Sequence, residues 1–309
     1  MNILITGGSG FIGSHLFDAL GDENNVAALT LSQYGYMASN DLEFKSLVVP
    51  NASKLTTVLS QFDLVIHCAG YNGRAVSPSL ELSNIKRDIS VTYDLVEAAI
   101  QTNLKTFVLL STGSMYESVN ASLSRELDRI NVDSPYKAAM FLKENYLHRR
   151  IQNTKLNGSV VRLFNVYGPG QTSSTIITKL IYEALIGRRL VRGDLDIFRD
   201  FIFIDDVIQF FKLYLRKEKS SSKKFEIFNL GTSCATSIRS IRRFMRYGVL
   251  YEKLASVRKH AFRNYLAADI SRAQCVLGWS PATRLDNGLL ITREWYSENL
   301  SILLNLFEN

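Results

Sequence analysis

Apolar runs of strand length alternate with apolar positions at helical spacing through the first half of the chain. The expected strands lie near 2–6, 26–31, 46–49, 63–67, 106–111 and 159–163, and the expected helices near 11–20, 53–60, 84–102 and 135–152. Strands that alternate with helices favour a parallel sheet covered by helices on both faces. The pattern therefore predicts an α/β fold built on a doubly wound parallel sheet.

A glycine-rich turn follows the first expected strand and leads into the first expected helix. Gly7 permits a sharp turn, Gly10 lets the backbone approach a pyrophosphate, and Gly13 lets the helix pack closely on the strand. The helix begins with Phe11 and Ile12. Its N-terminus would face the pyrophosphate, because backbone N–H groups and the helix dipole favour an anion there. An ordinary glycine turn is the alternative, but the strand before the loop and the helix after it match a dinucleotide site. The loop predicts dinucleotide binding through these five residues.

Further motifs follow in order along the chain. They are Asp63–Gly70, Leu110–Tyr116, Ser134–Tyr136, Arg162–Gln171, Arg199–Val207, Ala268–Ser271 and Leu277–Pro281. With them the chain resembles the extended short-chain dehydrogenase/reductase superfamily, in its NAD-dependent epimerase/dehydratase branch, which acts on sugar nucleotides. The resemblance implies a Rossmann-type dinucleotide-binding domain over residues 1–165. Segments within 201–230, namely Phe201–Ile204 and Phe225–Leu230, are expected to return to it, and 166–200 and 231–309 to form a smaller substrate-binding lobe.

The resemblance places further cofactor contacts at Thr30, Asn51 and Ala69. An acidic residue at the end of the second strand accepts hydrogen bonds from the adenosine 2′-hydroxyl and repels a 2′-phosphate, and Thr30 stands in its place. Loss of the carboxylate makes NADP acceptable beside NAD, although no arginine follows at once to hold the phosphate. NADPH is slightly favoured, and the alternative is that an acid such as Asp41 folds back onto the ribose.

Thr112 and Tyr136 are the catalytic residues that the resemblance implies. Thr112 would hydrogen-bond the sugar oxygen, and Tyr136 would transfer the proton while the nicotinamide transfers the hydride. The family carries a lysine one turn after the tyrosine, where it bonds the nicotinamide ribose and lowers the tyrosine pKa. Met140 occupies that position here. Lys137 lies about 100° around the helix and Lys143 roughly 10 Å further along it, so neither is expected to replace the missing lysine.

The missing lysine bears on the direction of reaction. An unperturbed tyrosine has a pKa near ~10, so at neutral pH it is a phenol that can donate a proton to a ketone. An enzyme that begins by oxidising an alcohol needs tyrosinate and would lose on the order of a thousandfold in active form. The sequence therefore predicts reduction of the 4-keto group of a nucleotide-linked, for example dTDP-linked, 4-keto-6-deoxyhexose in deoxysugar and polysaccharide (O-antigen) biosynthesis. A nucleotide-sugar 4-epimerase and a catalytically silent binding or regulatory subunit are the alternatives.

Substrate contacts are expected from Asn165, Arg199 and Arg258, which the resemblance places at the nucleotide diphosphate. The fork of an arginine guanidinium matches the geometry of phosphate oxygens. For Arg199 the alternative is an ion pair with its neighbour Asp200 or with Asp205.

Composition narrows the classes of partner. The 309 residues are 46% hydrophobic, enough for a large core, and no apolar run approaches the ~20 residues that span a membrane. Much of the net charge of +7 falls within 239–263, which fits a solvated basic face, with a possible part in attracting an anionic sugar nucleotide. We expect a cytoplasmic protein with no bound metal, no nucleic acid and no membrane partner. Cys68, Cys234 and Cys275 are expected to be reduced and buried.

Assembly as a homodimer is the last expectation. The helices near 84–102 and 135–152 correspond to those that form a four-helix dimer interface in much of the family. Their outer faces are expected to carry Ile100, Phe141 and Leu142.

Overall fold

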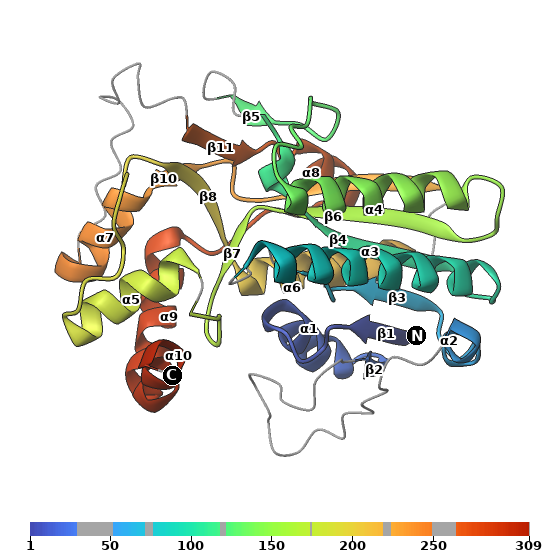
Figure 1. Ribbon diagram of the computed structural model, residues 1–309, viewed down its shortest axis with the longest axis horizontal. Coiled ribbons are helices and arrows are strands. Elements are labelled where there is room, and N and C mark those ends of the chain that lie inside the picture. The colour runs from blue at the N-terminus through green and yellow to red at the C-terminus, as the bar shows by residue number, and fades with distance from the viewer. Residues whose placement is uncertain are drawn as a thin grey trace. The chain divides into compact units, whose positions relative to one another are not determined.

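A computed structural model describes residues 1–29, 52–71, 77–117, 122–173, 175–218, 224–248 and 264–308 (Figure 1). Its contacts divide the chain into two compact units, each built from separate segments. Unit 1 comprises Met1–Met115, Ile130–Arg162 and Phe211–Phe228. Unit 2 comprises Tyr116–Arg129, Leu163–Phe210 and Asn229–Asn309.

Unit 1 alternates strands and helices as the apolar pattern predicts. Its elements are β1 (Asn2–Thr6), α1 (Phe11–Gly21), β2 (Asn25–Leu29), α2 (Ala52–Leu59), β3 (Leu64–His67), α3 (Pro78–Ile100), β4 (Thr106–Thr112), the short 3₁₀ helix η1 (Gly113–Met115), α4 (Pro135–Ile151), β6 (Asn157–Leu163) and β9 (Phe225–Leu230). The helix α6 (Ile204–Glu218) begins in unit 2 and ends in unit 1, and the last residues of β6 (Leu163) and β9 (Asn229 and Leu230) belong to unit 2. The expected strand near 46–49 lies outside the described residues.

The described strands of unit 1 pair in the order β2-β1-β3-β4-β6-β9. The pairs β1·β2, β1·β3 and β3·β4 are parallel. The chain adds β2 on one side of β1 and then adds β3, β4 and β6 on the other side. The order in which strands are added therefore reverses between β1 and β3, although the strands stay parallel. In such sheets a ligand binds beyond the carboxyl ends of the strands at the reversal. The loops after β1 and β3 therefore define the expected site.

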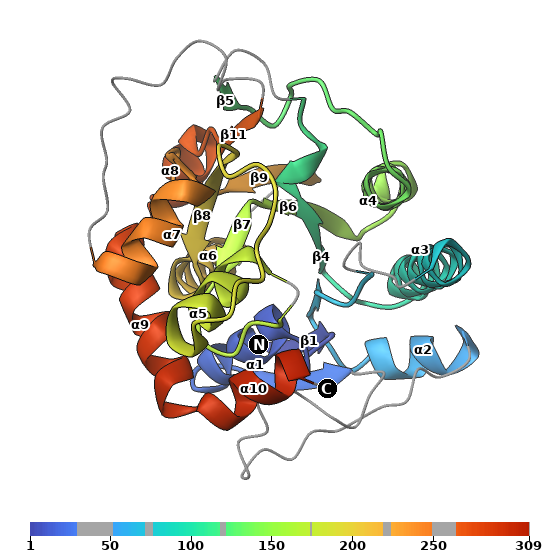
Figure 2. The same cartoon turned by 60° about the vertical axis from the view of Figure 1, so that its left-hand side comes forward.

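Helices cover both faces of this sheet. In Figure 2, α2, α3 and α4 lie on one face and α1 lies on the other. The helices of the first face contribute residues such as Leu59, Leu95 and Leu147 to a buried core, where they meet Val65 and Phe107 from the sheet. Packing of this kind fixes α3 and α4 side by side and so determines what their facing side chains can reach.

Unit 2 contains a second sheet in the order β10-β8-β11-β5, with β7 paired to β8. Its elements are β5 (Leu123–Ser124), β7 (Asn165–Tyr167), α5 (Ile176–Ile186), β8 (Phe198–Phe203), β10 (Ala235–Ser237), α7 (Ile238–Tyr247), β11 (Tyr265–Ala268), α8 (Ser271–Leu277), α9 (Leu285–Glu298) and α10 (Leu300–Glu308). The expectation that Phe201–Ile204 returns to the first lobe is wrong, because β8 belongs to this second sheet. The other expected return strand, β9, does join the first sheet.

A buried carboxylate explains where β8 pairs. Asp200 has no exposed surface and accepts hydrogen bonds from the backbone N–H groups of Thr232, Ser233 and Ala268 and from the Thr232 hydroxyl, at 2.6–3.1 Å. Burial raises the pKa of Asp200, and these hydrogen bonds oppose the rise. A buried carboxylate needs such donors, so the strand is held where β11 and the turn after β9 supply them.

Two of the three cysteines depart from expectation. Cys234 and Cys275 are exposed, whereas Cys68 is partly exposed and burial raises the pKa of its thiol. Cys275 lies on α8, where Ala273 takes the buried position. Over the described ranges, no helix combines the length and the apolar character needed to cross a membrane.

Candidate cofactor and active site

The glycine loop after β1 is shaped by close approaches that leave no room for side chains. Gly7 has a φ of +73°, and its N–H donates to the carbonyl of Leu29 at 2.8 Å. A Cβ on Gly7 would lie 2.7 Å from the backbone nitrogen of Ala69, in the loop after β3. A Cβ on Gly13 would lie 2.1 Å from the carbonyl oxygen of Gly7. Without side chains at these positions, the backbone of this loop packs against the loop after β3 and remains open to close approach by a ligand.

The first turn of α1 suits an anionic group. Gly10 is the N-cap, no side chain of the described residues caps the helix, and its first turn carries no acid. The unsatisfied N–H groups of the first turn and the positive end of the helix dipole both favour an anion. Phe11 and Ile12 supply two of these N–H groups. The bare glycine cradle and the uncapped helix fit the pyrophosphate of a dinucleotide.

A buried hydrogen-bond chain joins the ends of β1 and β3 to α3. The Thr92 hydroxyl donates to the Asp88 carbonyl at 2.9 Å, so its oxygen must accept from Nε2–H of His67 at 2.9 Å. The neutral Nδ1 of His67 then accepts from the Thr6 hydroxyl at 2.6 Å. The oxygen of Thr6 in turn accepts from the N–H of Ala69 at 3.3 Å. This chain fixes the histidine tautomer and holds the Ala69 loop against β1.

Because His67 is uncharged in the folded protein, we expect the free energy of unfolding to depend on pH. Burial, and next the charge of Lys143, lower the pKa of His67 to about 3. The unfolded chain binds a proton near pH 6.5 and the folded chain does not, so this residue should make stability fall as the pH drops from about 6.5 toward 3. The limiting slope is ~1.4 kcal/mol per pH unit. Urea unfolding between pH 7 and 4 measures it, and His67→Asn should flatten the curve by about that slope. Parallel curves for the two proteins would contradict the prediction.

Tyr136 and Thr112 both lie at the carboxyl edge of the unit 1 sheet. Thr112 ends β4, and its hydroxyl donates to Ser114 Oγ at 2.9 Å and accepts from the Ser114 N–H at 3.1 Å. Tyr136 lies in the first turn of α4, which packs against β4 and η1. The Tyr136 ring meets that of Tyr71 edge-on, with the centroids 6.4 Å apart. One strand end and one helix start thus bring the two expected catalytic residues to the same edge.

The helix face below Tyr136 carries a buried ion pair. Met140 is 6% exposed and packs into unit 1. One turn further on, Lys143 Nζ lies 2.8 Å from Asp88 Oδ2 of α3, and the two side chains are 1% and 5% exposed. Lys137 instead forms a more exposed ion pair with Asp133 at 2.8 Å. The sequence did not predict the pair, since lysine is seldom buried.

In unit 2, adjacent strands carry two of the expected substrate residues. Asn165 begins β7 and pairs in register with Phe201 of β8, and Arg199 lies two residues before Phe201. One guanidinium nitrogen of Arg199, Nη1, donates to the carbonyls of Phe198 and Asn264 at 2.8 and 2.7 Å. Burial lowers the pKa of Arg199, and within the described residues it forms no ion pair. Parallel pairing therefore places an amide and a guanidinium on neighbouring strands.

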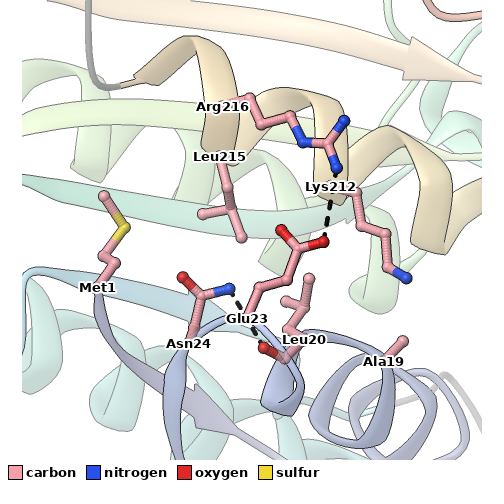
Figure 3. Close-up of a pocket in the computed structure, with 8 residues that line it drawn as sticks. All are labelled: Met1, Ala19, Leu20, Glu23, Asn24, Lys212, Leu215 and Arg216. Carbon is pink, nitrogen blue, oxygen red and sulfur yellow. Dashed lines mark hydrogen bonds and ion pairs between the residues drawn. The ribbon is translucent and has the colours of Figure 1, made fainter.

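Three expected site residues, Thr30, Asn51 and Arg258, lie outside the described residues. The hollow drawn in Figure 3 also contributes nothing to the candidate site. It has a volume of about 50 Å³ and lies at the amino end of β1, among Met1, Leu20 and the ion pair of Glu23 with Arg216 at 3.5 Å. The glycine loop is at the opposite end of β1, so this hollow belongs to the other edge of the sheet.

Curated relatives align with the chain over most of its length. It is 29% identical to a UDP-glucuronate 4-epimerase of Thermodesulfobacterium geofontis, over 98% of both chains. It is 25% identical to a dTDP-glucose 4,6-dehydratase of Haemophilus influenzae, over 97% of this chain and 99% of the relative. A dTDP-D-glucose 4,6-dehydratase of Dictyostelium discoideum is 28% identical, and there the match covers 74% of this chain and 58% of the relative.

Solved structures share the fold over nearly the whole chain. MoeE5, in complex with UDP-glucose and NAD, has a TM-score of 0.82 at 26% identity, with 97% of this chain and all of that chain covered. A UDP-glucuronic acid 4-epimerase from Bacillus cereus, in complex with UDP-glucuronic acid and NAD, has a TM-score of 0.78 at 26% identity with the same coverage. The family model described as NAD dependent epimerase/dehydratase matches residues 3–231. The chain therefore belongs to the NAD-dependent epimerase/dehydratase family.

Proposed function

We propose that this protein reduces the 4-keto group of a nucleotide-linked 4-keto-6-deoxyhexose with NADH or NADPH. The relatives act on nucleotide sugars by name, and the solved neighbours hold NAD with such sugars, which supports the substrate class and the cofactor. The observation that carries the direction of reaction is Met140. It is buried one turn after Tyr136, where a lysine would be needed to favour tyrosinate.

The roles of the residues follow from the needs of carbonyl reduction. The nicotinamide, when bound, supplies the hydride to the carbonyl carbon. Tyr136 gives its phenolic proton to the carbonyl oxygen and regains a proton from solvent, so the ketone gains two hydrogens and becomes an alcohol. Thr112 would turn its hydroxyl from Ser114 Oγ and donate that one O–H to the carbonyl, while the Ser114 N–H still donates to the Thr112 oxygen and orients it. The backbone around Gly7, Gly10, Phe11, Ile12, Gly13 and Ala69 would hold the dinucleotide.

A nucleotide-sugar 4-epimerase is the second candidate, because relatives and neighbours carry that name. An epimerase must first oxidise the C4 alcohol, which requires tyrosinate. We place it second because at neutral pH a tyrosine without help is ionised only to about one part in a thousand. The silent-subunit alternative predicts dinucleotide binding without turnover of any sugar.

One assay separates these alternatives. Purified protein is incubated with NADH or NADPH and a panel of nucleotide-linked 4-keto-6-deoxy sugars, and loss of the reduced cofactor is followed by absorbance. In parallel, UDP-glucose and UDP-glucuronate with NAD are tested for 4-epimer formation. Reduction of a keto-sugar supports the proposal, epimer formation supports the second candidate, and binding with neither reaction supports the silent subunit.

Diphosphate binding is proposed for Asn165 and Arg199 of unit 2 and for Arg258. The exposed part of the arginine fork would pair with phosphate oxygens while the Phe198 and Asn264 carbonyls fix its orientation. In this proposal unit 1 binds the dinucleotide and unit 2 binds the sugar nucleotide.

The cofactor preference should respond to Thr30. We expect Thr30→Asp to weaken NADPH binding by about tenfold or more while NADH binding changes little, because the new carboxylate would repel the 2′-phosphate. Calorimetric titration of both cofactors measures the two affinities, with Thr30→Asn as a neutral control of similar size. If the ratio of the affinities does not change, Thr30 does not lie at the ribose.

A homodimer is proposed through the outer faces of α3 and α4. Phe141 and Leu142 are 37% and 47% exposed on α4, as expected, whereas Ile100 packs against the core instead of outward. Sedimentation at micromolar concentration should give a dimer, and Leu142→Glu should shift it toward the 34.9 kDa monomer. A wild-type protein that sediments only as the monomer would contradict this assembly.

A further inference from the structure

The buried pair of Lys143 and Asp88 is a costly feature for a core to carry. Two charges with 1% and 5% of their side chains exposed have lost nearly all contact with water. Apolar residues of the same volume would usually stabilise such a position equally well or better, so retention of a buried pair calls for another reason. The neighbours of the pair indicate what that reason is.

The pair lies against the backbone of the loop after β3. A Cβ on Gly70 would be 3.2 Å from Asp88 Oδ1 and 3.4 Å from Lys143 Nζ, so a larger residue there would press on both charged groups. The next residue, Tyr71, presents its ring edge-on to Tyr136. The ion pair, the loop and the two tyrosines thus form one continuous packed group.

Helix geometry places the ammonium on the same side as Tyr136. Lys143 follows Tyr136 by seven residues, which is two turns and about 20° around the helix. Side chains of helical residues point back toward the N-terminus, which along α4 is the direction of Tyr136, and Lys143 and Met140 are both buried residues of this helix. The seven-residue spacing therefore puts the two residues on one side of the helix, with their backbones ~10 Å apart along its axis.

Within the described part of the loop after β3, the titratable groups add little net charge. His67 is neutral in the folded protein, and the thiol of Cys68 stays protonated because burial raises its pKa. Desolvation, and next the charge of Glu81, raise the pKa of Tyr71.

Ion pairs account for the nearby charges of α4. Lys137 is matched by Asp133 in the turn before the helix, and Glu144 is held by Arg162 of β6 at 2.6 Å. Among these described charges, Lys143 is the buried cation on the Tyr136 side of α4, and Asp88 lies in direct contact with it.

We propose that Asp88 and Lys143 are positioning residues that form a charge-balanced support beneath the loop 68–71 and keep Tyr136 in its protonated form. Lys143 holds the loop from α4, and Asp88 cancels the charge that would otherwise favour tyrosinate. This inference rests on the proposed function, in which Tyr136 donates a proton. It gives Asp88 a specific role, which is to keep Tyr136 protonated and able to donate a proton to a ketone.

The first test is the ionisation of Tyr136 in the full-length protein saturated with NADH. The tyrosinate absorbance of wild type minus that of Tyr136→Phe isolates one residue during an alkaline titration. The midpoint should lie near the ordinary value of about 10. A midpoint below about 8.5 would overturn the proposal. No keto-sugar is present, so a protein that fails to reduce any sugar still gives a clear result, and an active reductase with a low midpoint refutes this inference alone.

The second test changes the balance of charge. Asp88→Asn leaves the ammonium uncompensated and should lower the midpoint. Lys143→Met leaves the carboxylate uncompensated and should raise it. Each shift should be on the order of one pH unit, for charges roughly 10 Å apart at an effective dielectric constant of about 20. The double variant removes both charges and should match wild type.

Folding and cofactor binding need their own controls, because breaking one side of a buried pair is strongly destabilising. Circular dichroism and calorimetric titration with NADH show which variants retain the fold and the site. Folded single variants that shift the midpoint in the same direction, or not at all, would refute the charge balance, since a purely structural role predicts no opposite shifts. If a single variant does not fold, the wild-type titration and the double variant decide the question.

Discussion

Gly13→Ala should lower the affinity for NADH by about a hundredfold or more. The new Cβ would lie 2.1 Å from the carbonyl oxygen of Gly7, an atom that also accepts the hydrogen bond of the Gly10 N–H at 2.9 Å. The carbonyl is backbone and cannot rotate away by itself, so the loop or the start of α1 must move. Displacing the N–H groups that face the pyrophosphate by roughly 1 Å should cost about 3 kcal/mol of binding, which is about a hundredfold in Kd. Calorimetric titration with NADH measures it.

Gly21→Ala is the matched control on the same helix. A Cβ there meets nothing within 4 Å, and Gly21 is exposed at the end of α1. Alanine should stabilise the protein by about 0.5–1 kcal/mol through its helix propensity and leave the NADH affinity unchanged. A folded Gly13→Ala protein that binds NADH like wild type would show that this loop does not hold the dinucleotide.

Tyr136→Phe should lower the rate of ketone reduction by about a hundredfold or more, because a general acid typically contributes that much. The variant removes only the hydroxyl and keeps the ring that contacts Tyr71, so the fold and the NADH affinity should persist. The rate is best measured in a single turnover with saturating cofactor, which isolates hydride transfer from product release.

The control for this variant is Tyr71→Phe, which removes a hydroxyl from the neighbouring ring. Tyr71 touches Tyr136 but has no assigned part in proton transfer, so its variant should stay within about threefold of wild type. Equal losses in the two variants would mean that the Tyr136 hydroxyl has no special part in proton donation. Full activity in Tyr136→Phe would remove Tyr136 as the acid.

The sequence predicted local features well because they depend on residues close together in the chain. The glycine loop, the strands β1, β3, β4 and β6 and the helices α1, α2 and α4 have nearly the expected bounds, since their periodicity and turn residues are local properties. For α3, the start at Pro78 precedes the expected 84 because the Ser77 side chain accepts from the Leu80 N–H and caps the helix earlier. The positions of Thr112 and Tyr136 at one sheet edge also follow from local order.

Contacts between distant residues escaped sequence reasoning. The apolar run Phe201–Ile204 could pair in either sheet. In the second sheet, the neighbouring Asp200 meets hydrogen-bond donors that lie 32–68 residues away in the sequence. A strand carries no local sign of its partner, because any sheet accepts its backbone hydrogen bonds.

The sequence by itself determined the Rossmann-type framework and the absence of a lysine one turn after Tyr136. Only the tertiary structure decided that Lys143 turns inward and meets Asp88 across 55 residues, and that His67 is held neutral between two threonines. Local pattern treats a lysine as a surface residue because isolated charges avoid burial. The packing of α3 against α4 brought a carboxylate to that lysine, and a charge can stay buried where the fold supplies its partner.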